Sequence, residues 1–127
     1  MELTLQPADP RFAIQRFDSK SVTANGTRFT SGVILGYNTE PTAWNPRSLA
    51  DLQMLHIDTL LALQPELVLF GSGRAQGFLA PEMIVRLNRQ GVGCEAMTTA
   101  AACRTFNVLL SEGRRVVAAL IFDSETQ

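Results

Sequence analysis

Four apolar residues followed by a glycine-rich turn, Leu67-Val68-Leu69-Phe70-Gly71-Ser72-Gly73, decide the fold of this chain. The apolar run is short and continuous, and Pro65 and Gly71 bound it on either side. Such a run makes sense only as a strand whose two faces are both covered. The stretch therefore predicts a buried strand in an α/β domain.

Helical and strand patterns alternate on both sides of this strand. Met54, Ile57 and Leu61 fall at helical spacing before it, and Pro81 suits the first residue of a second helix after it. A strand over residues 92–97, a third helix that ends at Gly113 and a strand over 116–122 complete the pattern. This alternation predicts an α/β layer with a mostly parallel sheet and helices on both faces.

The N-terminal part is expected to add antiparallel strands. After a first strand over 12–17, Asn25-Gly26 suits the two-residue turn of a β-hairpin. The second hairpin strand is predicted to run from about 28 to 35 with a bulge at Gly32, and 37–46 to be a connection. Trp44 in that connection is interpreted as a packing residue, with ligand stacking as the alternative.

Length and composition indicate one domain and exclude several classes of protein. The 127 residues are divided into a flexible lead-in over 1–11, a single α/β domain over 12–122 and a polar tail over 123–127. A net charge of −1 with a single lysine argues against nucleic-acid binding. No apolar stretch suits a membrane span or a signal peptide, so a cytoplasmic protein without direct membrane insertion is expected.

Neither a metal nor a cofactor is predicted. His56, Cys94 and Cys103 give three soft ligands, whereas a structural zinc site needs four. Gly71, Gly73 and Gly77 match a dinucleotide fingerprint poorly, because the third glycine and the following helix both come too late. Since Cys103 lies on the apolar face of its helix, we expect it to be buried and inert, and no catalytic residue is assigned.

The candidate binding residues begin in two loops. Ligands of α/β sheets usually bind where parallel strands end, and there the turn of Gly71, Ser72 and Gly73 should meet Thr98 and Thr99. Small residues at a helix N-terminus suit a carboxylate or phosphate. The alternative is that the glycines only turn the chain and the threonines only cap the helix.

Arg104 and Asn107 extend this candidate surface. They share the polar face of the third helix, and asparagine is not favoured inside helices, so a specific contact is expected. Because helical side chains lean toward the N-terminus, Arg104 is predicted to reach back toward Thr98 and Thr99 and to hold a carboxylate. The competing interpretation is an internal ion pair with an acid such as Glu112.

Three segments resemble the motifs of a known single-domain family. They are Pro65-Glu66-Leu67-Val68-Leu69-Phe70-Gly71-Ser72-Gly73, the run from Glu95 through Thr98, Thr99 and Cys103-Arg104-Thr105-Phe106-Asn107 to Leu109, and Glu112-Gly113-Arg114-Arg115-Val116-Val117-Ala118-Ala119-Leu120. The chain is therefore similar to the family that includes mitochondrial complex I assembly factor 3 and the animal adipogenesis-associated protein. It departs from the family pattern at Ser72, Thr98 and Phe106, where Thr, Asp and Tyr are usual.

The resemblance implies a three-layer fold: a central mixed sheet, helices on both faces and an added hairpin layer. It brings no established activity or cofactor. It implies a non-catalytic binding or assembly module that resembles a respiratory complex I assembly factor, with protein partners that include respiratory-complex subunits. The alternative is a small anionic-ligand binder or an enzyme that uses Gly71 to Gly73 with Thr98 and Thr99. Loss of the usual Asp at Thr98 weakens acid–base chemistry there.

Overall fold

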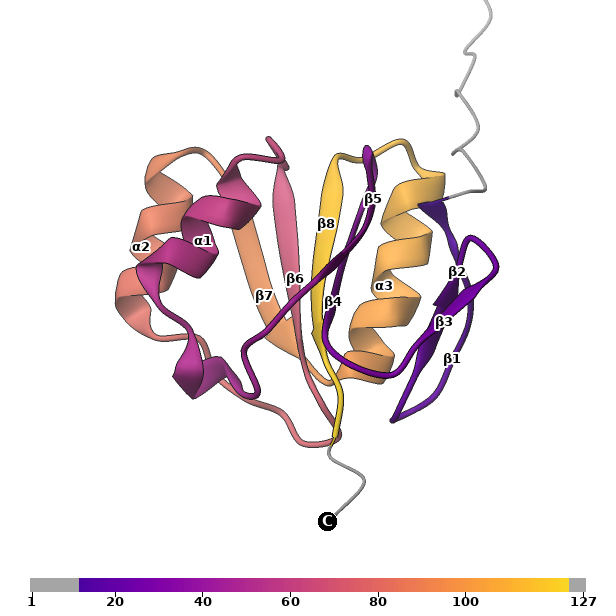
Figure 1. Cartoon of the computed structure of the whole chain (residues 1–127). Coiled ribbons are helices and arrows are strands. Elements are labelled where there is room, and N and C mark those ends of the chain that lie inside the picture. Colours follow the sequence, from indigo (N-terminus) through magenta and orange to yellow (C-terminus); the bar gives the residue numbers. More distant parts are fainter. Residues whose placement is uncertain (1–11, 124–127) are drawn as a thin grey trace, which may run out of the picture.

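The computed structural model describes residues 12–123, so the lead-in predicted over 1–11 and residues 124–127 of the predicted tail lie outside the described residues. Figure 1 shows a mixed α/β arrangement with two sheets and helices around the larger one. The elements, in chain order, are β1 (Ile14–Phe17), β2 (Val22–Ala24), β3 (Thr27–Phe29), β4 (Val33–Gly36), β5 (Thr39–Ala43), a 3-10 turn (Leu49–Asp51), α1 (Met54–Leu61), β6 (Leu67–Ser72), α2 (Pro81–Arg89), β7 (Gly93–Met97), α3 (Thr99–Ser111) and β8 (Val116–Ile121).

The larger sheet has the strand order β5-β4-β8-β6-β7. Strand β6 pairs in parallel with both β7 and β8, whereas β4 pairs antiparallel with both β5 and β8. The sheet is therefore mixed as expected, but in the described residues parallel and antiparallel pairings are equal in number, and the expectation of a mostly parallel sheet is not confirmed. The apolar run of β6 lies next to the central strand β8, all of whose residues are buried.

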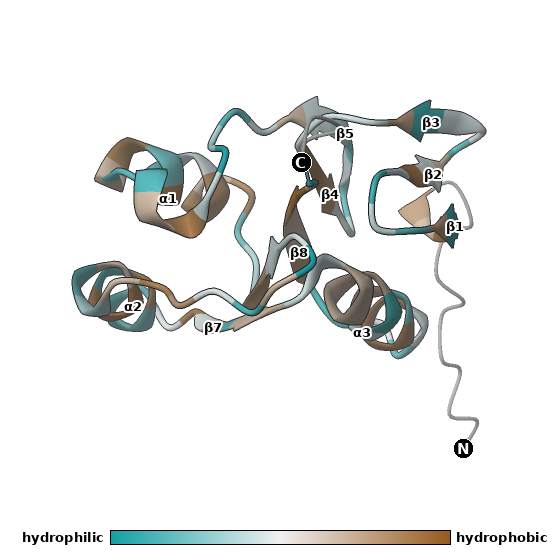
Figure 2. Ribbon diagram, turned by 90° about the horizontal axis from the view of Figure 1, so that it is seen from below, coloured by the Kyte–Doolittle hydropathy of each residue, from teal (hydrophilic) through white to brown (hydrophobic). Residues whose placement is uncertain are grey.

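Two apolar clusters fill the two faces of this sheet. On one face, Ile57, Leu60 and Leu87 of α1 and α2 pack against Val68 and Phe70 of β6. On the other face lie α3 and the small sheet β1-β2-β3, as Figure 2 shows from below. Phe106 is fully buried there, which explains why the chain tolerates phenylalanine in place of a tyrosine whose hydroxyl would need a partner.

The N-terminal hairpin is confirmed, but its second strand is shorter than predicted. Asn25 and Gly26 both have positive φ, 51° and 77°, and join β2 to β3. The strand predicted over 28–35 is instead divided into β3 and β4, which belong to different sheets. The predicted connection over 37–46 contains the edge strand β5, which tolerates Pro41 because an edge strand has one unpaired side.

Gly32 lies at the division between β3 and β4. Its carbonyl oxygen accepts a hydrogen bond from the Trp44 N–H at 2.9 Å, and a Cβ on Gly32 would lie 2.1 Å from the Trp44 carbonyl oxygen. A backbone atom of β8, the Leu120 carbonyl oxygen, would lie 3.3 Å away. The chain can pass from one sheet to the other only because residue 32 has no side chain.

Substitution Gly32→Ala should therefore lower the free energy of unfolding by about 3 kcal/mol, since backbone atoms cannot move aside as a side chain can. The exposed neighbour Ser31 makes a matched control, and Ser31→Ala should change stability by less than about 0.5 kcal/mol. Urea denaturation of both variants measures the difference. Equal stability of the two variants would contradict this account of Gly32.

Candidate functional site

The two loops predicted to meet at the carboxyl edge of the sheet lie against each other. The Thr99 N–H donates to the Gly73 carbonyl oxygen at 2.9 Å, and the Gly73 N–H donates to Thr99 Oγ1 at 2.8 Å. Gly71 makes this approach possible, because a Cβ on it would lie 2.9 Å from Thr99 Oγ1. The loop after β6 and the start of α3 are thus joined by a reciprocal pair of hydrogen bonds.

Thr99 extends this junction to the central strand. Its hydroxyl donates to the Ile121 carbonyl oxygen at 2.5 Å, at the end of β8, and the residue is only 1% exposed. A hydroxyl has one proton to donate, so Thr99 has no proton left for a ligand once it donates to Ile121, and its oxygen also accepts from Gly73. Thr99 therefore contributes to the structure of this edge and presents no free hydroxyl to a ligand.

Ser72 closes the loop that follows β6. Its Oγ lies 2.7 Å from the Ala75 carbonyl oxygen and 3.0 Å from the Met97 carbonyl oxygen, and it accepts from the Gly77 N–H at 3.0 Å. The single hydroxyl proton serves the two carbonyl groups, while the lone pairs serve Gly77. A threonine, usual in the family motif, would offer the same hydroxyl.

Thr98 caps α3, as the structural alternative predicts. Its Oγ1 accepts from the Ala101 N–H at 3.3 Å, and its carbonyl oxygen accepts from the Ala102 N–H at 2.9 Å. With Thr99 N–H bonded to Gly73, three of the first amides of this helix already have partners in the protein. The side chain of Thr98 and the neighbouring loop of the protein thus satisfy two of the amides at this helix end, those of Ala101 and Thr99.

Arg104 and Asn107 lie away from this edge, beside β1. Asn107 Oδ1 accepts from the Ile14 N–H and Asn107 Nδ2 donates to the Ile14 carbonyl oxygen, both at 2.8 Å. The Arg104 guanidinium lies 5.9 Å from the centre of the Phe17 ring. The specific contact expected of Asn107 is thus one that holds β1 to α3, and the structure places the Arg104 head over β1 rather than at the Thr98 turn.

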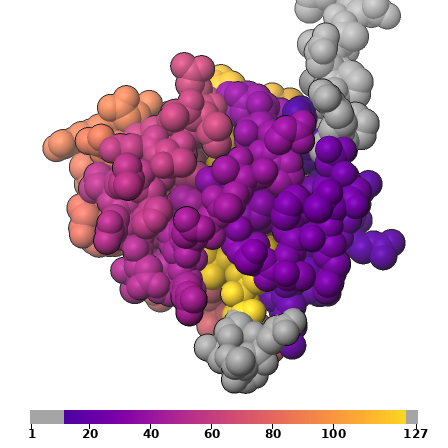
Figure 3. Space-filling view, in the orientation of Figure 1, coloured from indigo at the N-terminus to yellow at the C-terminus, as the bar shows by residue number. Residues whose placement is uncertain are grey.

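A hollow of about 780 Å³ opens at the same carboxyl edge, on the side toward β4. Its floor is the end of β8, seen in yellow between the purple and magenta segments in the lower half of Figure 3. Ser72 borders it, and the exposed cations Lys20 and Arg47 lie on its rim without an ion pair in the described residues. Asp123 also borders it, but this carboxylate accepts from the Arg74 N–H at 3.0 Å and pairs with Arg74 Nε at 3.3 Å.

Trp44 forms part of the wall of this hollow. The residue is 4% exposed, as expected for a packing role, and its ring meets the His56 ring edge-on with centroids 5.5 Å apart. Its Nε1 has no hydrogen-bond partner in the part of the chain that the structure describes. His56 Nδ1 accepts from the Gln53 N–H at 2.9 Å, so the proton of the neutral ring is on Nε2.

The sequence interpretation missed Lys20, Arg47 and Asp123 as residues of this edge. They come from the β1–β2 turn, from the segment after β5 and from the end of β8. The one local signal of a loop with a defined conformation was the segment Trp44-Asn45-Pro46-Arg47.

The cysteines do not form a reactive centre. Burial raises the pKa of the Cys103 thiol to about 12, with the neighbouring Arg104 charge only partly opposing that effect. Burial also raises the pKa of Cys94, and the nearby Glu95 carboxylate adds to the shift. In residues 12–123, no cluster of three or more His, Cys, Asp or Glu side chains could hold a metal ion.

Replacing Thr99 by valine should lower the free energy of unfolding by about 3 kcal/mol, because Gly73 N–H and the Ile121 carbonyl would both be left buried without a partner. The matched control is Thr59→Val, since the exposed Thr59 hydroxyl only bonds the Leu55 carbonyl of its own helix. Thermal or urea unfolding compares the two variants. A Thr99→Val protein as stable as Thr59→Val would refute the role of this junction.

Cys103 should not react with a thiol reagent in the native protein at mildly alkaline pH, because its sulfur is buried and its pKa is raised. The partly exposed Cys94 should react first, at a rate below that of a free thiol. A Cys94→Ser variant isolates Cys103, whose labelling should wait for unfolding in denaturant. Rapid labelling of that variant in native buffer would contradict this prediction and show that Cys103 is reactive.

None of the helices in residues 12–123 has both the length and the apolar character needed to cross a bilayer. Among curated proteins, the chain is similar to the "NADH dehydrogenase [ubiquinone] 1 alpha subcomplex assembly factor 3" of Mus musculus, with 32% identity over 110 residues that cover 85% of this chain. It is also similar to a "13 kDa major membrane protein" of Francisella tularensis, with 32% identity over 73 residues that cover 58% of this chain. The aligned part spans 59% of the length of each of these two relatives.

A solved structure confirms the fold over nearly all of the chain. The crystal structure of a Bordetella parapertussis protein superposes with a TM-score of 0.84 at 36% identity, covering 92% of this chain and 100% of that one. A family model described as "Protein of unknown function (DUF498/DUF598)" matches residues 14–121. The match includes all three motifs seen in the sequence and both sheets of the structure, and the chain therefore belongs to the DUF498/DUF598 family.

Proposed function

We propose that this protein is a non-catalytic binding module that helps to assemble a larger protein complex, as the name of its mouse relative describes. In this proposal residues 12–122 act as one three-layer unit in the cytoplasm, with the larger sheet between two covering layers. Protein partners, among them respiratory-complex subunits, are what such a module would hold. Membership of a family that includes assembly factors supports this choice.

One observation carries the proposal: the edge at which α/β sheets commonly hold small ligands is closed by its own hydrogen bonds. Gly73 and Thr99 bond each other, Thr99 also bonds Ile121, and Ser72 is occupied by its own loop. Outer surfaces, where large molecules bind, also carry side chains without a partner in the described residues. They include the exposed apolar side chains Leu55, Phe78, Val85 and Val108 and several arginines.

A second candidate function is a small-anion binder in the hollow beside this edge. The unpaired cations Lys20 and Arg47 on the rim of that 780 Å³ hollow favour it, together with Ser72 at its border. Of the seven candidate binding residues predicted from the sequence, only Ser72 lines this hollow, and Trp44, for which ligand stacking was the alternative, forms part of its wall. Gly71, Gly73, Thr98 and Thr99 would act indirectly, by holding the edge in place.

The assembly proposal predicts that deleting the gene lowers the amount of assembled respiratory complex severalfold while the separate subunits are still made. Native electrophoresis with subunit-specific detection measures both quantities. The deleted strain is complemented with the wild-type protein and with Arg89→Ala, a control on the exposed surface of α2, and both should restore assembly. Unchanged levels of assembled complex in the deleted strain would exclude the proposal.

Thermal unfolding with inorganic phosphate, nucleotides and small carboxylates separates the two functions. A ligand that binds the folded state raises the melting temperature in a saturable way. The assembly module should show no such rise at millimolar ligand. A saturable rise that Arg47→Ala abolishes would instead establish the anion site.

A further inference from the structure

Ion pairs neutralise some arginines of this protein and leave others free. Asp123, Asp58 and Glu66 pair with Arg74, Arg86 and Arg114 at 3.3, 2.7 and 3.1 Å. By contrast, in the described residues, three exposed arginines near the small sheet have no carboxylate within pairing distance: Arg16, Arg28 and Arg104. Arg16 and Arg28 lie on the small sheet itself, and Arg104 lies beside it on α3, so three unpaired positive charges are close together at this layer.

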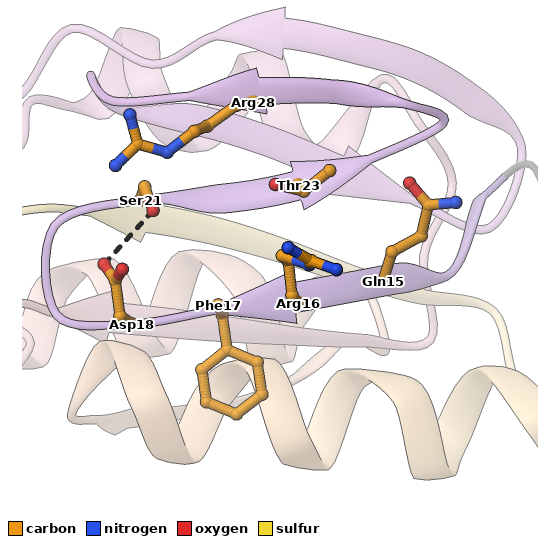
Figure 4. Close-up of a pocket in the computed structure, with 7 residues that line it drawn as sticks. All are labelled: Gln15, Arg16, Phe17, Asp18, Ser21, Thr23 and Arg28. Carbon is orange, nitrogen blue, oxygen red and sulfur yellow. Dashed lines mark hydrogen bonds between the residues drawn. The ribbon is translucent and has the colours of Figure 1, made fainter.

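A second hollow, of about 480 Å³, lies on the outer face of the small sheet. Figure 4 shows Arg16, Thr23 and Arg28 on three neighbouring strands, lining this face. Among residues 12–123, Asp18 is the one carboxylate that lines it, and it already accepts from the Lys20 N–H at 2.8 Å and from Ser21 Oγ at 3.1 Å. The hollow is thus lined by two arginines, and its carboxylate is already bonded within the protein. This excess of positive charge suits an anionic ligand.

Phe17 connects this hollow to α3. The residue lines the hollow, and its ring turns toward the helix in Figure 4. Arg104 lies over that ring at 5.9 Å, a contact that leaves its positive charge unneutralised. The positive surface therefore continues from β3 across β1 to α3, and Arg104 belongs to it.

The two edges of the small sheet differ in how their backbone groups are satisfied. On β1, Asn107 bonds both the N–H and the carbonyl of Ile14. At the other edge, Ala24 of β2 and Thr27 of β3 flank a two-residue turn and form a hydrogen-bonded pair. The next pair, Thr23 of β2 and Arg28 of β3, is therefore not hydrogen-bonded. The N–H and the carbonyl of Arg28 hence point away from β2, and Figure 2 shows β3 on the outer side of the sheet, away from α3.

We propose that this surface binds an extended acidic segment of a partner protein, which adds as a strand to β3 and places a carboxylate on Arg28, while the charge of Arg16, two strands away on β1, adds to the attraction. A free strand edge recognises peptide backbone, and guanidinium groups recognise carboxylates in bidentate pairs. Alternate residues of a strand face the same side, so acidic residues at every second position fit the arginine face. A net charge of −1 and the small size of the patch disfavour nucleic acid.

This inference rests on the proposed function, because it names the chemistry of the partner that an assembly module would hold. The probe is a fluorescent octapeptide with alternating Glu and Val, and the reference peptide carries Gln in place of Glu. Fluorescence anisotropy should show tighter binding of the Glu peptide, and binding should weaken at about 0.5 M salt. The double variant Arg16→Gln/Arg28→Gln should bind the Glu peptide about tenfold more weakly.

Arg89→Gln is the matched control, since Arg89 is exposed and unpaired within residues 12–123 but lies on α2. It should bind the peptide as the wild type does. Both changed arginines of the double variant are exposed, so its melting temperature should be close to that of the wild type, and the two single variants are measured beside it. Equal binding of Glu and Gln peptides, undiminished binding by the double variant, or tighter binding of an oligonucleotide or anionic vesicle would overturn the proposal.

Complementation of the deleted strain tests the peptide-binding surface separately from the proposed assembly function. If deletion lowers the amount of assembled complex and the double variant restores it fully, the assembly role is supported and the proposed role of the arginine surface is contradicted. If deletion leaves the amount of complex unchanged although the double variant no longer binds the Glu peptide, the binding surface is supported and the assembly role is contradicted. Loss of both peptide binding and assembly in the double variant supports both.

Discussion

The buried hydroxyl of Thr99 is the contact on which the carboxyl edge of this fold depends. It joins three parts of the chain far apart in sequence: the loop after β6, the start of α3 and the end of β8. None of the three could separate without leaving a polar group buried and unpaired. The absence of a side chain at Gly71 is the complementary condition, because it lets α3 approach the sheet closely enough for these bonds to form.

Much of the fold could be predicted because its signals are local. The apolar run of β6, the proline that begins α2 and the apolar stripe of α3 each lie within one element, and all three elements were found. The division between β3 and β4 could not be found in this way, because it is caused by the backbone of Trp44, twelve positions along the chain from Gly32. The pairing of β4 with β8 is a long-range choice of the same kind, and it makes the sheet evenly mixed.

The candidate site shows a different limit of sequence interpretation. Residue types correctly indicated that Gly73 and Thr99 lie in loops that meet, but not whether their polar groups face a ligand or each other. In Asn107 the pattern pointed to a specific contact, and the structure shows that the contact is internal, with the backbone of Ile14. A polar residue at an unfavoured helical position signals that a partner exists, and only the three-dimensional arrangement shows which one.

The small sheet combines firm attachment with a free surface. Its inner side is anchored by buried Ile14, Val22 and Ala24 and by the Asn107 amide, so the sheet is held against α3 and the larger sheet. Its outer side has no packing to preserve, since Gln15, Arg16 and Arg28 are exposed. Substitutions there change charge and shape without disturbing the core. Although the carboxyl edge of the larger sheet is closed by internal hydrogen bonds, the fold can thus still acquire binding specificity. It can do so through the small sheet, whose inner side packs on the core and whose outer residues are free to vary.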